Sequence, residues 1–325
     1  MAVAFDTVDV IVLVVASFLS LIIGGLVFKF GGSQRLSVDY FLGGRKQHFI
    51  PVCLSLAVSY QSSIVVLGTP AEIYIYGPGY MIGCLGMLTL IPTTFIISLP
   101  LFYKLKLTSL YQYFDKRFAT NHVRCFMVVV GISFNMAYVG IVLLGPAMVF
   151  QPLFGIPEWA IIVIICVFTV LYTSVGGIKA VIWTDVFQAC VMLCGLISVL
   201  VIGTSLSGGS SEVVKIASEY NRSTVNDFNS DPTIRHTFWT VVIGNALRTS
   251  LFAVQQPMIQ RLNSTPTIAN ARLAVIGFVL MFIVIDILSG CCRLVAFAVY
   301  VTKRCDPLAA KIISNPNQIM ILTIQ

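Results

Sequence analysis

The stretch Ser55-Leu56-Ala57-Val58-Ser59-Tyr60-Gln61-Ser62-Ser63 lies within an apolar segment long enough to cross a bilayer, and it decides the fold. Its last five residues are all polar, and the segment closes with Gly68-Thr69-Pro70. Hydroxyl and amide groups at this depth can line a polar cavity, or let the backbone unwind so that its carbonyls hold a cation. The alternative is that the hydroxyls bond to the preceding turn or a neighbouring helix. So dense a cluster favours a transport or ion site.

The composition is that of a polytopic membrane protein. The 325 residues are 58% hydrophobic and 10% charged, with a mean hydropathy of +0.94, far from the values of soluble domains. The net charge of +7 comes mostly from loops between apolar runs, where the positive-inside rule accounts for it. It therefore does not indicate nucleic-acid binding, and the expected surroundings are a lipid bilayer.

No motif for covalent chemistry is present. The nine cysteines lie mostly inside apolar runs without a metal-ligand spacing, and the three histidines lie in loops. GxSxG, P-loop and HExxH patterns are absent. The sequence therefore predicts that the chain is not an enzyme and needs no organic cofactor or resident metal.

Eight apolar runs are each long enough to span a membrane. They are expected at 8–28, 49–67, 79–102, 124–150, 159–175, 180–204, 238–258 and 273–301. The prediction is a single all-α transmembrane domain with an outer loop at 205–236 and a C-terminal outer segment at 302–325. The first run is expected to be a retained helix, because its acidic flank is unlike the positive start of a signal peptide.

The distribution of basic residues between alternate loops predicts the orientation. One side carries twelve, namely Lys29, Arg35, Arg45, Lys46, Lys104, Lys106, Lys116, Arg117, Arg124, Lys179, Arg261 and Arg272. The other side carries six, namely Lys215, Arg222, Arg235, Lys303, Arg304 and Lys311. The richer side is predicted to be cytoplasmic, which leaves the N-terminus outside. A glycosylation acceptor, Asn221-Arg222-Ser223, falls on the predicted outer side.

Three charged residues inside the spans invite a functional interpretation. Asp185, near the cytoplasmic end of its span, could attract a cation leaving the site, pair with Lys179, or simply reach the interface. Arg248 and Asp286 lie deep in two spans, where each charge costs about 2.5–3.5 kcal/mol on insertion scales. They are expected either to form a mutual ion pair or to leave Arg248 facing a cavity that attracts an anion. Arg293, nearer the outer surface, could snorkel. Gln255, just before Gln256-Pro257, is expected at a gate or binding site, or at a plain helix end.

With these residues in view, the chain resembles the sodium/solute symporter family, in the branch of the sodium-coupled monocarboxylate, multivitamin and iodide symporters. The resemblance extends over essentially the whole chain. It is carried by Pro51–Leu56, Val66–Tyr74, Gly176–Gln188, Gln256–Arg261 and Cys305-Asp306-Pro307. The run Gly-Gly-Ile-Lys-Ala-Val-Ile-Trp-Thr-Asp-Val-Phe-Gln at 176–188 is its most specific part.

The resemblance implies inverted five-helix repeats preceded by one extra N-terminal helix, with sodium-driven alternating access. Sodium would be held at Val58, Gln61 and Ser62 on a broken second helix, and Asp185 would support the coupling. A small organic anion would be held in a cavity lined by Tyr60, Val65, Tyr138 and Arg248, with Gln255 as a further candidate. The expected location is the plasma membrane.

Two departures from the family pattern bear on function. The chain ends before the ninth span, whose paired hydroxyls complete the family's sodium site, so an incomplete second repeat and a truncated product are expected. Relatives usually have an aromatic residue where Arg248 stands and a small one where Asp286 stands. The favoured function is sodium-coupled symport of a small organic anion, such as a monocarboxylate or a vitamin-like carboxylate. The alternative is a non-transporting or ligand-binding membrane protein that associates with a full-length relative.

Overall fold

The structure is a computed structural model that describes residues 7–30, 37–61, 65, 68–220, 222 and 227–303. Every regular element in these ranges is helical, which confirms the expected all-α class. In chain order they are α1 (Thr7–Phe30), α2 (Ser37–Leu42), η1 (Gly43–Arg45), α3 (Phe49–Tyr60), α4 (Thr69–Tyr76), η3 (Pro78–Thr89), α5 (Leu90–Thr93), η4 (Thr94–Tyr103), α6 (Tyr111–Phe118), α7 (Asn121–Phe154), α8 (Glu158–Leu206), α9 (Ser210–Glu219), η5 (Trp239–Ile243), α10 (Gly244–Ser250), η6 (Leu251–Val254), α11 (Gln256–Leu262) and α12 (Ile268–Thr302).

Among the described residues, four helical runs are long and apolar enough to cross a membrane. They are Pro78–Tyr103, Asn121–Gln151, Glu158–Leu206 and Ile268–Thr302. The first of these joins η3, α5 and η4 into one rod. Shorter apolar helices occupy Val14–Val27, Phe49–Tyr60 and Trp239–Val254. The eight predicted spans, and the outer segments between and after them, remain predictions, and the segment from residue 304 onward lies outside the described residues.

The segment predicted to span at 49–67 is broken. Helix α3 ends at Tyr60, and Gln61 leaves the helical conformation with φ −89° and ψ 71° while its N–H still bonds to the Ala57 carbonyl. The next described helix, α4, begins only at Thr69. Serines next to the break compete for backbone hydrogen bonds, and Pro70 suits a new helix start. The break therefore lies inside the polar cluster on which the sequence argument depends.

A second break interrupts the segment predicted to span at 238–258. The helical run ends at Val254, Gln255 is extended (φ −85°, ψ 145°), and α11 starts again at Gln256. Pro257 has no N–H to donate to the preceding turn, so the helix cannot continue through it unbroken. This break sets the direction of α11, which carries Arg261 back toward α3.

Helix α8 bends sharply at Gly177, between the two predicted spans at 159–175 and 180–204. Gly177 has φ 58° and ψ −161°, a conformation that only a residue without a Cβ adopts readily. The second half of the helix then carries Asp185 toward the centre of the molecule.

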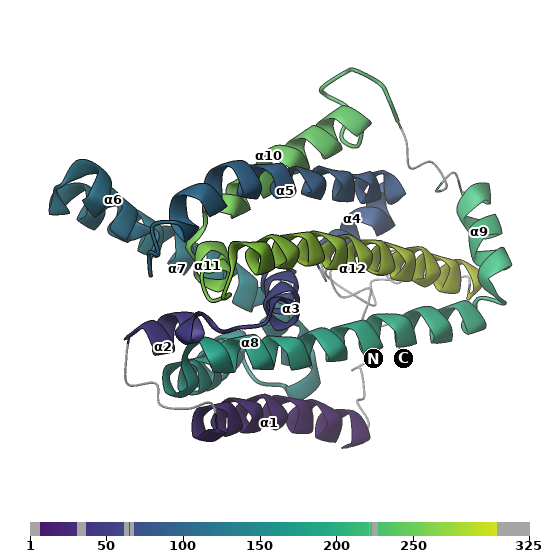
Figure 1. The fold of residues 1–325 in the computed structure, drawn as a ribbon. Helices are drawn as coiled ribbons and strands as arrows, with labels where there is room; N and C mark the ends of the chain where they lie inside the picture. The colour runs from purple at the N-terminus through teal and green to yellow at the C-terminus, as the bar shows by residue number, and fades with distance from the viewer. Residues whose placement is uncertain are drawn as a thin grey trace.

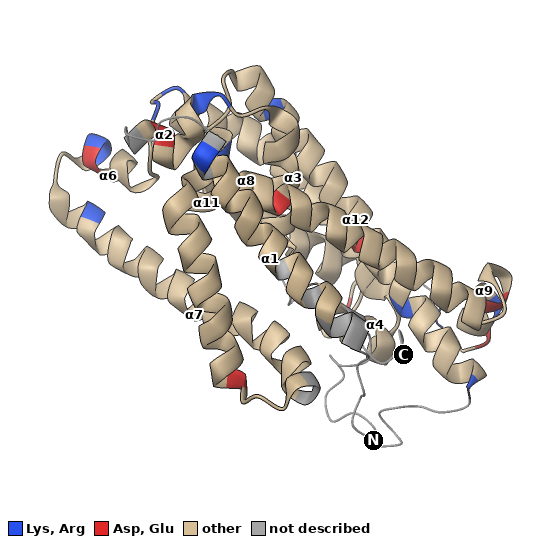
Figure 2. Cartoon of the chain, turned by 90° about the horizontal axis from the view of Figure 1, so that it is seen from below, with Lys and Arg blue, Asp and Glu red and all other residues tan. Residues whose placement is uncertain are grey.

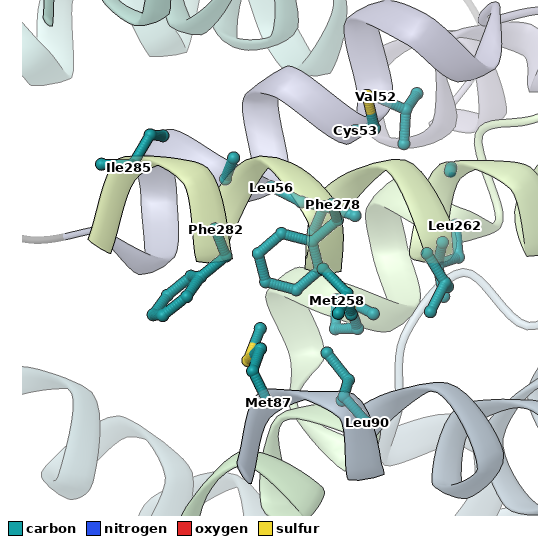
Figure 3. Packing of buried hydrophobic residues seen from close by; sticks show 14 of the residues in the cluster. Val52, Cys53, Leu56, Met87, Leu90, Met258, Leu262, Phe278, Phe282 and Ile285 are labelled. Carbon is teal, nitrogen blue, oxygen red and sulfur yellow. The ribbon is translucent and has the colours of Figure 1, made fainter. Parts of the chain in front are cut away.

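Helix α12 forms the centre of the packing. It lies between the η3–α5–η4 rod and α8 (Figure 1), and it also packs against α3. Around Phe278, which is fully buried, side chains from α3, α11 and the rod meet (Figure 3). They include Leu56, Met87 and Met258. Lipid is as apolar as these side chains, so close van der Waals packing is the main contribution to holding such helices together.

Charged residues lie mostly near the ends of the bundle, and α7 exposes apolar side chains along its length. Figure 2 shows most of the Lys and Arg residues at the end where α2 and α6 lie, with acidic residues in both of those helices, and charges of both signs also lie near α9. No residue of the most apolar stretch of α7 is buried, and Phe126, Phe134 and Met136 are each more than 60% exposed. A helix with an apolar exterior is typical of one that faces lipid or further helices.

Candidate ion and solute sites

A buried ion pair joins three helices near the broken segment. A guanidinium nitrogen, Nη2, of Arg261 on α11 lies 3.0 Å from Oδ2 of Asp185 on α8, and both side chains are 9% exposed. Two hydroxyls of α3 complete the network. Ser55 donates to Asp185 Oδ2 at 2.6 Å and accepts from Arg261 Nε at 2.7 Å, while Ser59 accepts from Arg261 Nη2 at 2.6 Å.

The local sequence explains why these groups meet. Ser55 and Ser59 are four residues apart on α3 and therefore share one face. Such a buried pair is tolerated only where further hydrogen bonds satisfy both charges, which the two hydroxyls supply. Arg261 was expected in a cytoplasmic loop, but it lies within α11 and is 7% exposed. The sequence signal that could have indicated this role of Arg261 was Asp185, because a carboxylate inside a predicted span needs a cation as its partner.

The end of α3 carries the predicted sodium ligands. Val58 lies in the last helical turn, where backbone carbonyls lose their regular partners. Gln61 is 5% exposed, and its amide nitrogen donates to the Phe282 carbonyl on α12 at 3.3 Å. Its amide oxygen, Oε1, is buried without a hydrogen-bond partner among the described residues. Ser62 lies outside the described residues. The structure thus places Val58, Gln61 and Asp185 around the last two turns of one helix, and their sodium role remains a prediction.

Tyr60 points its ring into the apolar core beside the break. Its ring centroid lies 4.4 Å from that of Phe252 and 5.5 Å from that of Phe278. Its hydroxyl is buried and has no hydrogen-bond partner among the described residues. A buried phenol normally bonds to something, so this oxygen and Gln61 Oε1 are two unsatisfied polar atoms on adjacent residues.

A small cavity lies between the rod, α10 and α12. Val65, Arg248 and Asp286 line it, together with Thr69, Tyr80, Gly83, Cys84, Met87, Asn245, Thr249 and Phe282. Arg248 is exposed, donates from Nε to Asn245 Oδ1 at 3.0 Å, and lies over the Phe252 ring at 5.7 Å. Arg248 and Asp286 form no ion pair within 4.0 Å in the described part of the chain. Arg248 lines the cavity, and its role in attracting an anion stays a prediction.

The expectation that Arg293 snorkels is wrong. Its side chain turns into the bundle and is 3% exposed. It donates to Ser289 Oγ at 2.6 Å and to the Val65 carbonyl at 3.4 Å. Arg293 therefore ties α12 to the connection between α3 and α4, as Gln61 does through the Phe282 carbonyl. The environment of Arg293 is therefore set by packing among the helices and not by the position of the residue along the predicted span.

Three of the predicted substrate residues do not line this cavity. Tyr138 on α7 is 40% exposed and stacks on Phe134 of the same helix, with ring centroids 6.4 Å apart. Gln255 occupies the second helix break, where its carbonyl accepts from the Ile259 N–H, and it is half-buried. Tyr60, Tyr138 and Gln255 are all absent from the residues that line the cavity.

Comparison with known proteins identifies relatives of this chain. The model of the sodium:solute symporter family matches residues 40–324. The chain belongs to the sodium:solute symporter family. This symporter chain is 41% identical to the human sodium/iodide cotransporter over 90% of its length and 45% of the relative's. It is 34% identical to sodium-coupled monocarboxylate transporter 1 of Xenopus laevis, over 98% of its length and 51% of the relative's.

The symporter chain therefore spans about half the length of the curated relatives that it matches. A solved structure with the same fold is titled "Substrate-bound outward-open state of a Na+-coupled sialic acid symporter reveals a novel Na+-site". It superposes with a TM-score of 0.87 at 23% identity, over 99% of this chain and 66% of that one. The similarity confirms the helical symporter fold, and the inverted repeat stays an implication of it. The family and these relatives are transporters rather than enzymes.

Proposed function

We propose that the chain is part of a sodium-coupled symporter that moves a small organic anion across the plasma membrane by alternating access. The observation that carries the proposal is the broken α3 with the buried network around it. The break frees backbone and amide oxygens of Val58 and Gln61 for a cation, and Ser62, the next residue in the sequence, is proposed as a further ligand. Asp185 on α8 accepts hydrogen bonds from Ser55 and Ser59 of α3 and supplies the negative charge that favours a cation there. No organic cofactor enters this scheme, because the sodium gradient supplies the energy.

The ion pair explains how one side of such a protein stays closed. Arg261 and Asp185 hold α11, α8 and α3 together through four hydrogen-bonded groups. Arg261 is one of the twelve basic residues on the side that is predicted to be cytoplasmic. We therefore place this network at the inner side, where it holds the protein closed. A sodium ion that reaches Asp185 competes with Arg261 for the carboxylate and so weakens the closure. Binding and opening are thereby coupled by one residue.

The cavity supplies the anion site. Arg248 offers a positive charge in an apolar segment, and Phe282, Met87 and Val65 give the cavity its apolar walls. An ionised side chain within a membrane segment is a functional site by default, since a charge at that depth is costly. The proposed solute is a monocarboxylate or a vitamin-like carboxylate.

The test is the sodium dependence of radiolabelled anion uptake by cells that express the native product. Gln61→Leu and Asp185→Asn should each raise the half-saturating sodium concentration at least about tenfold, the effect of losing about 1.4 kcal/mol. Gln151→Leu, on the exposed end of α7, is the matched control and should change nothing. Unchanged sodium dependence in both site variants would contradict the site.

The exposed face of α7 favours a second candidate, in which the chain binds a full-length relative and does not itself transport. The apolar side chains of that face have no partner helix covering them among the described residues. A tagged chain should then co-purify with a full-length sodium-coupled monocarboxylate transporter from detergent extract. Replacing Phe134 and Met136 with serine should abolish the co-purification. Uptake by the chain in proteoliposomes without any relative would rule this candidate out.

A further inference from the structure

Two opposite charges line the cavity without neutralising each other. Arg248 comes from α10 and Asp286 from α12, and they make no ion pair within 4.0 Å. Each is costly at this depth. Where two such charges face one cavity and do not meet, a bound solute can occupy the space between them.

The Asp286 carboxylate keeps its full hydrogen-bonding capacity for the cavity. It is half-buried, and none of the described residues hydrogen-bonds to it. Arg293 lies seven residues further along α12 and therefore on the same face, so its charge moderates that of Asp286. Its hydrogen bonds go to Ser289 and to the Val65 carbonyl instead. An ionised carboxylate accepts up to about four hydrogen bonds, and an ammonium group offers three donors.

The Arg248 guanidinium is similarly available. It commits Nε to Asn245, and its two terminal nitrogens make no hydrogen bond within the described ranges. Those nitrogens form the fork that matches a carboxylate in a bidentate arrangement. Asn245 thus orients the arginine and leaves the part that recognises carboxylates toward the cavity.

We propose that this cavity selects a small zwitterion, a solute whose carboxylate binds Arg248 and whose ammonium group binds Asp286. The inference rests on the proposed function and narrows its substrate class from organic anions to amino-acid-like compounds. A simple monocarboxylate satisfies Arg248 but leaves the half-buried Asp286 carboxylate without a donor, and leaving a charged group unpaired is penalised. The small size of the cavity favours the smallest members of the class.

Glycine and glycolate form a matched pair of probes, because they differ only in an ammonium group against a hydroxyl. Binding of each radiolabelled compound is measured on the purified chain in nanodiscs, in sodium and in choline buffer. Glycine is expected to bind at least about tenfold more tightly than glycolate in sodium. Equal affinities, or a preference for glycolate, overturn the zwitterion inference while leaving a sodium-dependent anion symporter intact. Sodium-independent binding, or binding of neither compound to folded protein, overturns the proposed function as well.

Variants identify the groups responsible. Asp286→Asn should lower glycine affinity at least tenfold and change glycolate affinity by less than about threefold, whereas Arg248→Gln should weaken both. Asp286→Glu keeps the carboxylate and should keep the preference for glycine, which covers the case in which Asp286→Asn fails to fold. Asp231→Asn, in the exposed outer loop, is the control and should bind both probes like the unmodified chain. Equal loss of both probes in Asp286→Asn overturns the assignment of Asp286 to the ammonium group.

Discussion

Arg261 and Asp185, 76 residues apart in the sequence, form a 3.0 Å ion pair in the interior, and two serines of α3 bond to both of them. Removing one partner leaves the other charge buried, which typically costs about 3–5 kcal/mol. Asp185→Asn and Arg261→Gln should therefore each lower the free energy of unfolding by about that amount.

The double variant should recover part of the loss, because neither charge is then left alone. The measurement is detergent-induced unfolding followed by circular dichroism, with all four proteins in the same micelles. Strictly additive single effects would contradict the pair as a coupled unit.

Gly177 offers a test of the kink in α8. A Cβ at φ 58° and ψ −161° is strained, so Gly177→Ala should destabilise the protein by about 1–3 kcal/mol. Gly140 in α7 is the matched control, since an added Cβ there meets no atom within 4 Å. Gly140→Ala should be neutral or stabilise by up to about 1 kcal/mol. The measurement is thermal unfolding of both variants. Equal melting temperatures of Gly177→Ala and Gly140→Ala would contradict the kink at Gly177.

The cluster of Glu72, Arg235 and His236 predicts a pH effect. Nε2 of His236 lies 3.1 Å from Oε1 of Glu72, which also pairs with Arg235 at 2.7 Å. Burial lowers the pKa of His236, and the Glu72 carboxylate opposes this only in part. The folded state therefore holds its proton less tightly than the unfolded state does. The resulting stability is complete above the ordinary histidine pKa of about 6.5 and is lost as the pH falls through that value toward the lower folded pKa.

The melting temperature should accordingly fall between pH 7.5 and pH 5.5, and the fall should be smaller in His236→Gln. Other titrating groups act equally on both proteins, so the difference between the two curves isolates this histidine. A steeper fall in the variant than in the unmodified chain would contradict the sign of the effect.

The proposed orientation can be read from glycosylation. Asn221 lies outside the described residues, between Tyr220 at the end of α9 and Arg222, in the predicted outer loop. If that loop is extracellular, the chain expressed in mammalian cells should increase in electrophoretic mobility after N-glycosidase treatment, and Asn221→Gln should abolish the increase. A second acceptor sequence, Asn263-Ser264-Thr265, falls on the predicted inner side. A glycan that persists in Asn221→Gln but disappears with Asn263→Gln would reverse the topology.

Local sequence patterns, formed by residues a few positions apart, predicted much of this architecture. The apolar runs correspond to helical segments, and the polar cluster correctly marked the break after Tyr60. Pro257 likewise indicated the break at Gln255. These features follow from backbone hydrogen bonding and side-chain shape, which act over a few residues.

The sequence did not predict contacts between residues that lie far apart along the chain. Asp185 stood out as a costly carboxylate, but Arg261 looked like an ordinary loop cation. Arg293 was expected to reach the surface, whereas packing against the α3–α4 connection holds it inside. Tyr138 was placed at the substrate cavity by resemblance; its ring stacks on Phe134 of the same helix, and its substrate role stays a prediction. Such outcomes depend on how helices pack, which local patterns do not determine.

The most direct test of the account is equilibrium binding of radioactive sodium to the purified chain in nanodiscs, without any solute. We expect saturable binding that Gln61→Leu weakens at least tenfold and Asp185→Asn also weakens, while Gln151→Leu leaves it unchanged. Binding that is equally strong in all four proteins, or sodium binding that none of them shows while correctly folded, would contradict a sodium site at the break of α3.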